Sequence, residues 1–149
     1  MNNLAIDFTD NTEEKALKDT KKIRAKTKGY SFNIWERKWV LDKNITINLD
    51  FFHENLDVET LNSFVHVLAY YASNLSASHT YNVAVRFNHM IKSTGSSVID
   101  DTVLINYRAA LSTLNEWYLG TVRGFLRKWY ELGYDGIDES VIQLLEGWI

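Results

Sequence analysis

The spacing of apolar residues along the chain changes near Leu56. Upstream of this residue, apolar side chains occupy every second position in two runs: Tyr30, Phe32, Ile34, and Ile45, Ile47, Leu49. Alternation of this kind, rich in aromatic and β-branched residues, predicts β-strands. Residues 42–44 supply a turn between the runs. Residues 30–52 are therefore expected to form a small sheet of two or three short strands, anchored by Trp35 and Trp39.

Downstream of Leu56 the apolar spacing follows the period of an α-helix. Helices are expected over residues 57–75, 77–93, 100–114, 116–132 and from 138 onward. Asp57, Asp100 or Asp101, and Asp138 are placed to cap the first, third and last of them, and Gly133 to end the fourth. The predicted fold class is mainly α, a bundle of four or five helices over residues 57–149, with the β segment packed against or beside it. Trp129 is expected to be buried in this bundle.

Residues 1–29 show no sustained apolar period and are expected to form a flexible basic lead or a frayed basic helix. Seven basic residues face three acidic ones within residues 13–28, a net charge of +4. Residues 135–149 carry four acidic residues and no basic residue. The whole-chain charge of −3 disfavours nucleic-acid binding when taken alone, but it conceals this uneven distribution.

Composition excludes several classes of protein. A length of 149 residues fits one domain, and a hydrophobic content of 46% is enough for a core. The absence of cysteine excludes disulfides, Cys-ligated zinc and a thiol nucleophile. No transmembrane run and no signal peptide are recognisable, so a cytoplasmic protein without membrane contact is expected. The apolar pattern breaks off at Ile149 inside the last helix, which predicts a chain truncated at its C-terminus.

No familiar catalytic or metal-binding pattern occurs in the sequence. The histidines lack the spacing of a helical metal site, and nucleotide-binding loops and nucleophile elbows are missing. We therefore expect no metal, no cofactor and no enzymatic activity in this chain. The four histidines are His53, His66, His79 and His89.

The second predicted helix has a polar face suited to DNA. Its members recur at helical spacing, all can donate a hydrogen bond, and no acidic residue occurs between Glu59 and Asp100. Arginine pairs with guanine and asparagine with adenine in the major groove, while the other side chains reach phosphates. An ordinary solvated helix face is the alternative. The predicted DNA-binding residues are His79, Asn82, Arg86, His89 and Lys92.

The fourth predicted helix offers a second basic surface. Gly120 would let a phosphate backbone approach closely, and nearby arginines would neutralise it. Two alternatives remain: an ion pair between Arg127 and Glu131, and close helix packing at the Gly120–Gly124 spacing. The predicted DNA-binding residues on this helix are Thr121, Arg123, Arg127 and Lys128.

Four stretches carry a resemblance to a known family. They are residues 66–72 (HVLAYYA), 87–92 (FNHMIK), 105–111 (INYRAAL) and 116–134 (EWYLGTVRGFLRKWYELGY). Over residues 57–149 the chain resembles the N-terminal region of phage-type integrases of the tyrosine recombinase family. The resemblance implies a SAM-like helical core-binding domain that clamps one face of a recombination site. It also implies three partners: double-stranded DNA, the protein's own catalytic domain and other protomers on DNA.

The sequence departs from this family at the catalytic motif. The resemblance places the Arg, His-x-x-Arg and Tyr chemistry in a separate domain, and no histidine here is followed by arginine three positions later. This chain is therefore expected to hold DNA, with its acidic last helix facing away from the DNA, and not to cut it. A helical protein-interaction module, built on five Trp and eight Tyr, is the alternative. An enzyme with an unrecognised carboxylate site is a third hypothesis.

Overall fold

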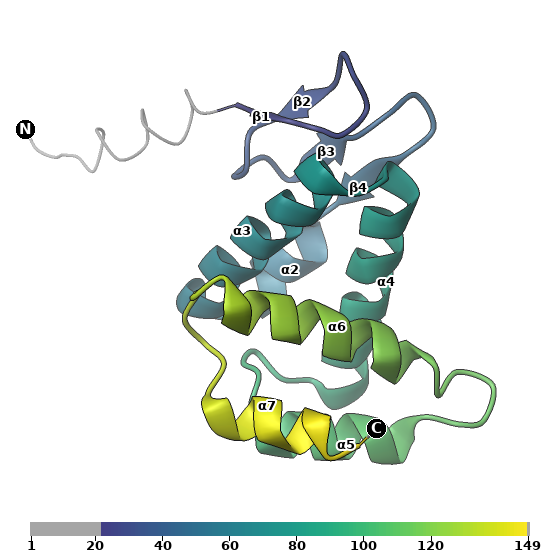
Figure 1. Cartoon of the computed structure of the whole chain (residues 1–149), viewed down its shortest axis with the longest axis vertical. Helices are drawn as coiled ribbons and strands as arrows, with labels where there is room; N and C mark the ends of the chain where they lie inside the picture. The colour runs from purple at the N-terminus through teal and green to yellow at the C-terminus, as the bar shows by residue number, and fades with distance from the viewer. Residues whose placement is uncertain (1–21, 149) are drawn as a thin grey trace, which may run out of the picture.

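A computed structural model describes residues 22–148, in which six helices and four short strands are found. Figure 1 shows the strands together at one end of the molecule and the helices making up the rest. The prediction of a mainly helical chain preceded by a small β segment is confirmed. The flexible lead predicted for residues 1–21 lies outside the described residues. No helix within residues 22–148 is long and apolar enough to cross a membrane.

The strands form two antiparallel pairs. They are β1 (Ile23–Arg24), β2 (Ser31–Phe32), β3 (Lys38–Val40) and β4 (Thr46–Asn48). β1 pairs with β2, and β3 pairs with β4 in a register that sets Trp39 opposite Ile47. The β segment begins at residue 23, so the prediction that the lead extends to residue 29 is wrong. Residues 22–29 are held because Lys26 N donates to Ala72 O at 2.8 Å and Ser73 Oγ donates to Arg24 O at 2.9 Å.

A short helix, α2 (Asp50–Asn55), follows the strands where the β segment was expected to continue to residue 52. Phe51 and Phe52 are adjacent, and two consecutive large apolar residues cannot share one face of a strand. In the helix, Phe52 is fully buried while Phe51 stays half-buried. The Asn48 side chain accepts a hydrogen bond from Asp50 N at 2.9 Å and turns the chain at this point.

The five longer helices correspond to those predicted. They are α3 (Val58–Asn74), α4 (Ala77–Thr94), α5 (Asp101–Ala110), α6 (Tyr118–Glu131) and α7 (Glu139–Glu146). The carboxylates of Asp57 and Asp100 accept hydrogen bonds from Thr60 N and Val103 N, as expected of N-caps. Asp138 precedes α7 but makes no side-chain cap hydrogen bond. Gly133 ends α6 with φ of +82°, as a left-handed residue should.

The connection between α5 and α6 differs from the prediction. The side chain of Asn115 accepts a hydrogen bond from Ser112 N at 2.8 Å, so a turn replaces the helix here. α5 therefore ends at Ala110 and α6 begins at Tyr118, two residues later than expected. Leu114, which the helical spacing placed on the apolar stripe, is 87% exposed.

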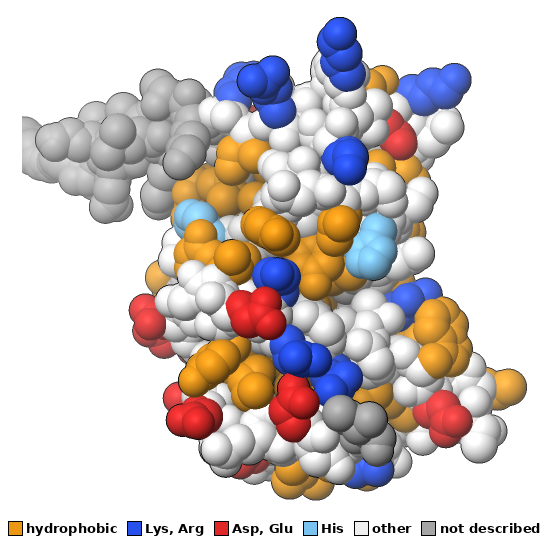
Figure 2. Space-filling model, in the orientation of Figure 1, with side chains coloured by type: hydrophobic (Ala, Val, Ile, Leu, Met, Phe, Trp, Pro, Cys, Tyr) orange, Lys and Arg blue, Asp and Glu red, His pale blue; other side chains and the backbone are white. Residues whose placement is uncertain are grey.

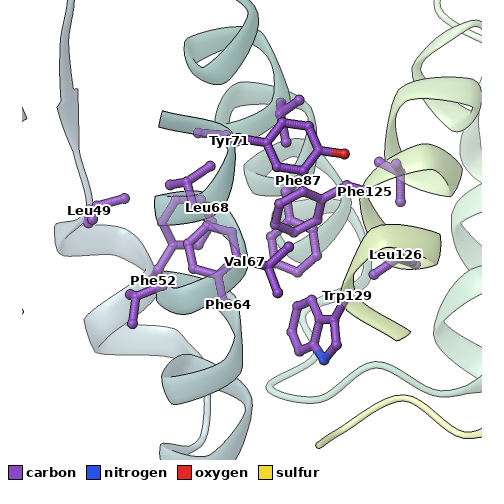
Figure 3. Close-up of a cluster of buried hydrophobic side chains, with 14 of the residues drawn as sticks. Leu49, Phe52, Phe64, Val67, Leu68, Tyr71, Phe87, Phe125, Leu126 and Trp129 are labelled. Atoms are coloured by element: carbon purple, nitrogen blue, oxygen red, sulfur yellow. The ribbon is translucent and has the colours of Figure 1, made fainter. Parts of the chain in front are cut away.

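One core joins the strands and the helices. Phe64 stacks on Phe87 at 4.8 Å between ring centroids, and Phe125 lies against both (Figure 3). Trp129 is fully buried beside this group, which confirms its predicted place. On the strand side, Trp39 is also fully buried and belongs to the same apolar cluster. The sheets and the bundle therefore pack as one unit, in which β1 lies against the end of α3.

Candidate nucleic-acid interface

The polar face predicted on α4 is exposed near the start of the helix, and its side chains are partly buried farther along. His79 and Asn82 are exposed. Arg86 is half-buried, with its guanidinium carbon 4.0 Å from the centroid of the Trp117 ring. Its Nη1 donates to Thr121 Oγ1 at 3.2 Å. The structure thus brings Arg86 and Thr121, predicted on separate helices, into direct contact.

Farther along α4, His89 points toward α5 and α6. Its Nδ1 lies 2.8 Å from the hydroxyl of Tyr107, and its ring meets that of Tyr118 at 5.2 Å. Burial raises the pKa of Tyr107 to about 12, so the hydroxyl keeps its proton at neutral pH. Lys92 is exposed, and its ammonium lies 5.5 Å from the centroid of Phe51. His79, Asn82 and Lys92 are therefore the exposed donors of this face, with the His79 ring stacked on Tyr71 at 5.8 Å, while Arg86 and His89 are engaged within the protein.

The two glycines of α6, Gly120 and Gly124, lie on a part of its surface that no other residue contacts. A Cβ built at Gly120 or Gly124 would meet no atom within 4 Å. Close helix packing, the simplest explanation of their spacing, is therefore wrong. Both lie inside a helix, where glycine is less favourable than alanine. Packing within the described residues therefore does not explain why glycine occupies either position.

The arginines of α6 pair with the last helix. Glu146 of α7 lies 3.5 Å from Arg123 Nη2 and 3.0 Å from Arg127 Nε. The predicted pair between Arg127 and Glu131 is therefore replaced, and Glu131 instead lies 3.2 Å from Lys128 Nζ. The acidic α7 therefore packs on α6, and its Glu146 lies beside the two arginines of that helix. Figure 2 shows basic and acidic side chains alternating over these two helices.

The most basic surface lies on the strands. Residues 22–49 contain seven basic and two acidic residues, whereas residues 50–148 contain six basic and twelve acidic residues. Arg37 pairs with Asp50 and Glu54. The other six basic side chains are exposed and have no ion pair within residues 22–148. Figure 2 shows basic side chains gathered at the end of the molecule that holds the strands. We call these residues the basic sheet surface: Lys22, Arg24, Lys26, Lys28, Lys38 and Lys43.

Sequence reasoning named the basic segment Lys15–Lys28 only as the alternative DNA face and did not place its residues on strands, although a signal for this exists. Basic residues occupy every second position from Lys22 to Lys28, with Ile23, Ala25 and Thr27 between them. Of the residues between them, Ala25 is buried and Ile23 and Thr27 are half-buried. This is the alternation of a strand with one face in solvent. Counting the segment only as a run of charge hid this period.

Contacts link the basic sheet surface to α3, and basic side chains occur again on α6. Lys26 Nζ donates to Asn74 O, at the end of α3, at 3.4 Å. The next helix, α4, starts with no acidic residue in its first turn and exposes His79 there. Across α3, Lys128 Nζ lies 5.2 Å from the ring centroid of Tyr70. Figure 2 shows one face with basic side chains over the strands and again over α6.

Within residues 22–148 no group of three or more His, Asp or Glu side chains is placed to hold a metal ion. No family model matches the chain, and neither a curated protein nor a solved structure similar to it was found. The chemistry of the face itself is what a functional proposal rests on.

Proposed function

We propose that this chain holds double-stranded DNA, as the DNA-binding N-terminal part of a tyrosine recombinase of the phage-integrase type. The basic sheet surface carries this proposal. Six exposed cations without ion pairs in residues 22–148 gather at one end of a protein whose net charge is −3. Cations that replace the counterions of a phosphate backbone are the main source of affinity for DNA.

The face formed by α4 and α6 adds a second contact in this proposal. His79 and Asn82 expose donors at the start of α4, and donors of this kind read base edges or bind phosphates. Gly120 and Gly124 leave room for a DNA backbone against α6. Arg86 has a different role from the one its sequence position suggests. Stacked on Trp117 and bonded to Thr121, it holds α4 and α6 together beneath the face.

The resemblance to phage-type integrases assigns this binding a place in recombination. The chain would clamp the recombination site while a separate catalytic domain cuts and rejoins the strands. No cofactor is needed for such a role, because it consists of contacts to phosphates and bases. We assign it to the cytoplasm, together with other protomers on the same DNA.

Anisotropy of a fluorescein-labelled 20-bp duplex, measured over a salt series, tests the proposal. The parent should bind at low salt and lose affinity steeply as salt rises. Replacing Lys26 and Lys28 together by alanine should weaken binding and reduce the salt slope by about two units, one per lost charge. Arg108→Gln on α5, at the other end of the molecule, is the control for the loss of one positive charge outside the basic sheet surface and should change affinity and salt slope little.

Two results would contradict the proposal. The first is a parent protein that does not bind duplex DNA even at low salt. The second is a double variant with the affinity and salt slope of the parent, because the basic sheet surface would then not be the contact.

A protein-interaction role is the second candidate, favoured by exposed apolar side chains between α5 and α6. Leu114 is 87% exposed and Trp117 is 55% exposed. Such residues are enriched at protein interfaces when they cluster. An apolar interface loses little affinity at high salt, so the same salt series separates this candidate from DNA binding.

A further inference from the structure

Two arginines of α6 converge on one carboxylate. Arg123 and Arg127 are one helical turn apart, and each contacts a different oxygen of Glu146, at 3.5 Å and 3.0 Å. A phosphate presents its oxygens to guanidinium groups in the same way, with a charge that suits the arginines equally. The two arginines are therefore placed to bind an anion, and the Glu146 carboxylate is the anion that they bind here.

The carboxylate is the exchangeable member of this cluster. The side chains of Arg127 and Glu146 are 44% and 42% exposed, and exposed ion pairs contribute little to stability. Arg123 is held independently of Glu146, because its Nε donates to Leu145 O at 3.1 Å and Leu145 is fully buried. Glu146 can therefore rotate into solvent while Arg123 stays in place.

The cluster also lies on the helix that the proposed function sets against DNA. Gly124 is between the two arginines in sequence and leaves the helix surface open beside them. Lys128 follows Arg127 directly, and its ammonium contacts Glu131 at 3.2 Å and the ring of Tyr70 at 5.2 Å. A DNA backbone lying along α6 would bring a phosphate to the position of the Glu146 carboxylate.

We propose that Arg123 and Arg127 form a phosphate-binding site, which Glu146 fills in the free protein and yields to a phosphate of the DNA backbone. This inference rests on the proposed function. Its consequence is that α7 weakens DNA binding, because every contact of the arginines with DNA must first replace an ion pair. Arg123 and Arg127, which the sequence predicts to bind DNA, then contact it only after a phosphate has replaced Glu146.

Glu146→Gln tests the proposal, with Glu139→Gln on the same helix as a control for the loss of one negative charge. Glu139 makes no ion pair within the described residues. Glu146→Gln should bind the labelled 20-bp duplex roughly fivefold more tightly than the control, the factor that the upper end of an exposed ion pair represents.

Arg127→Ala, made in the parent and in Glu146→Gln, supplies the second comparison. Its cost in affinity should be larger in the Glu146→Gln background, because nothing offsets the lost phosphate contact there. Thermal melting checks that all variants fold. The proposal is overturned if Glu146→Gln binds like Glu139→Gln, or if Arg127→Ala costs the same in both backgrounds. Binding by the parent in those cases leaves the proposed function intact, whereas no binding by any variant overturns both.

Discussion

At the scale of single residues, Trp129 is one of the two tryptophans that are fully buried. Its ring is fully buried, and its Nε1 donates to Asp135 O at 2.8 Å, which fastens the turn after α6. Trp129→Ala should lower the free energy of unfolding by about 3–5 kcal/mol, because it leaves a cavity and an unpaired carbonyl. Denaturant unfolding measures this loss. A variant with the midpoint of the parent would show that Trp129 is not part of the core.

The buried tyrosines predict how stability depends on pH. Burial raises the pKa of Tyr107 and of Tyr71 from 10.0 to about 12. The folded protein thus holds these protons more tightly than the unfolded chain. The contribution of this proton binding to the free energy of unfolding is complete below pH 10. It is lost between pH 10 and 12, by about 1.4 kcal/mol per pH unit for each tyrosine.

Tyr107→Phe checks this dependence. Urea unfolding of the parent and the variant, measured from pH 9 to 11.5, should show a shallower decline of stability with pH in the variant. The Phe variant loses the contact with His89 at every pH, so only the slope is compared. Equal slopes would contradict the assignment of the loss to Tyr107.

At the scale of elements, α6 contains two glycines, which are unfavourable inside a helix, on a surface that no other residue covers. Gly120→Ala and Gly124→Ala should each raise the free energy of unfolding by about 0.5–1 kcal/mol, because alanine favours the helix and the added methyl meets no atom within 4 Å. Under the proposed function the same variants should bind DNA more weakly, since the methyl holds the backbone away. Thermal melting and anisotropy measure the two effects.

Ser93→Ala on α4 is the control for these glycine variants. Ser93 is exposed within a helix, so this change favours the helix without altering α6. It should stabilise the protein and leave DNA affinity unchanged. Glycine variants that gain stability and keep full affinity would exclude a close backbone approach at α6.

The elements also show where local sequence signals suffice. Asp57 and Asp100 cap their helices as their positions predict, because a cap depends only on the next three residues. The α5–α6 connection could not be predicted from spacing, because Leu114 fits the helical period and yet is exposed. There the Asn115 side chain competes with the helix for backbone hydrogen bonds. Spacing alone does not report such competition.

At the scale of the whole molecule, charge is divided between two parts that share one core. The strand region has an excess of five positive charges and residues 50–148 have an excess of six negative charges. Because Trp39 and Trp129 belong to one apolar cluster, the two parts keep a fixed relation. The basic end can therefore meet a polyanion while the acidic end with α7 lies away from the strands (Figure 1).

The sequence by itself determined the helices, most of their ends, the presence of a small β segment and the burial of Trp129, because these follow from local periodicity and capping. Only the tertiary structure decided which charges are free. Arg86 is engaged by Trp117 and Thr121, and Arg123 and Arg127 by Glu146, through contacts between separate helices. Such contacts depend on how the helices cross, which a pattern along one helix does not contain. The six cations of the basic sheet surface, by contrast, make no ion pair within residues 22–148.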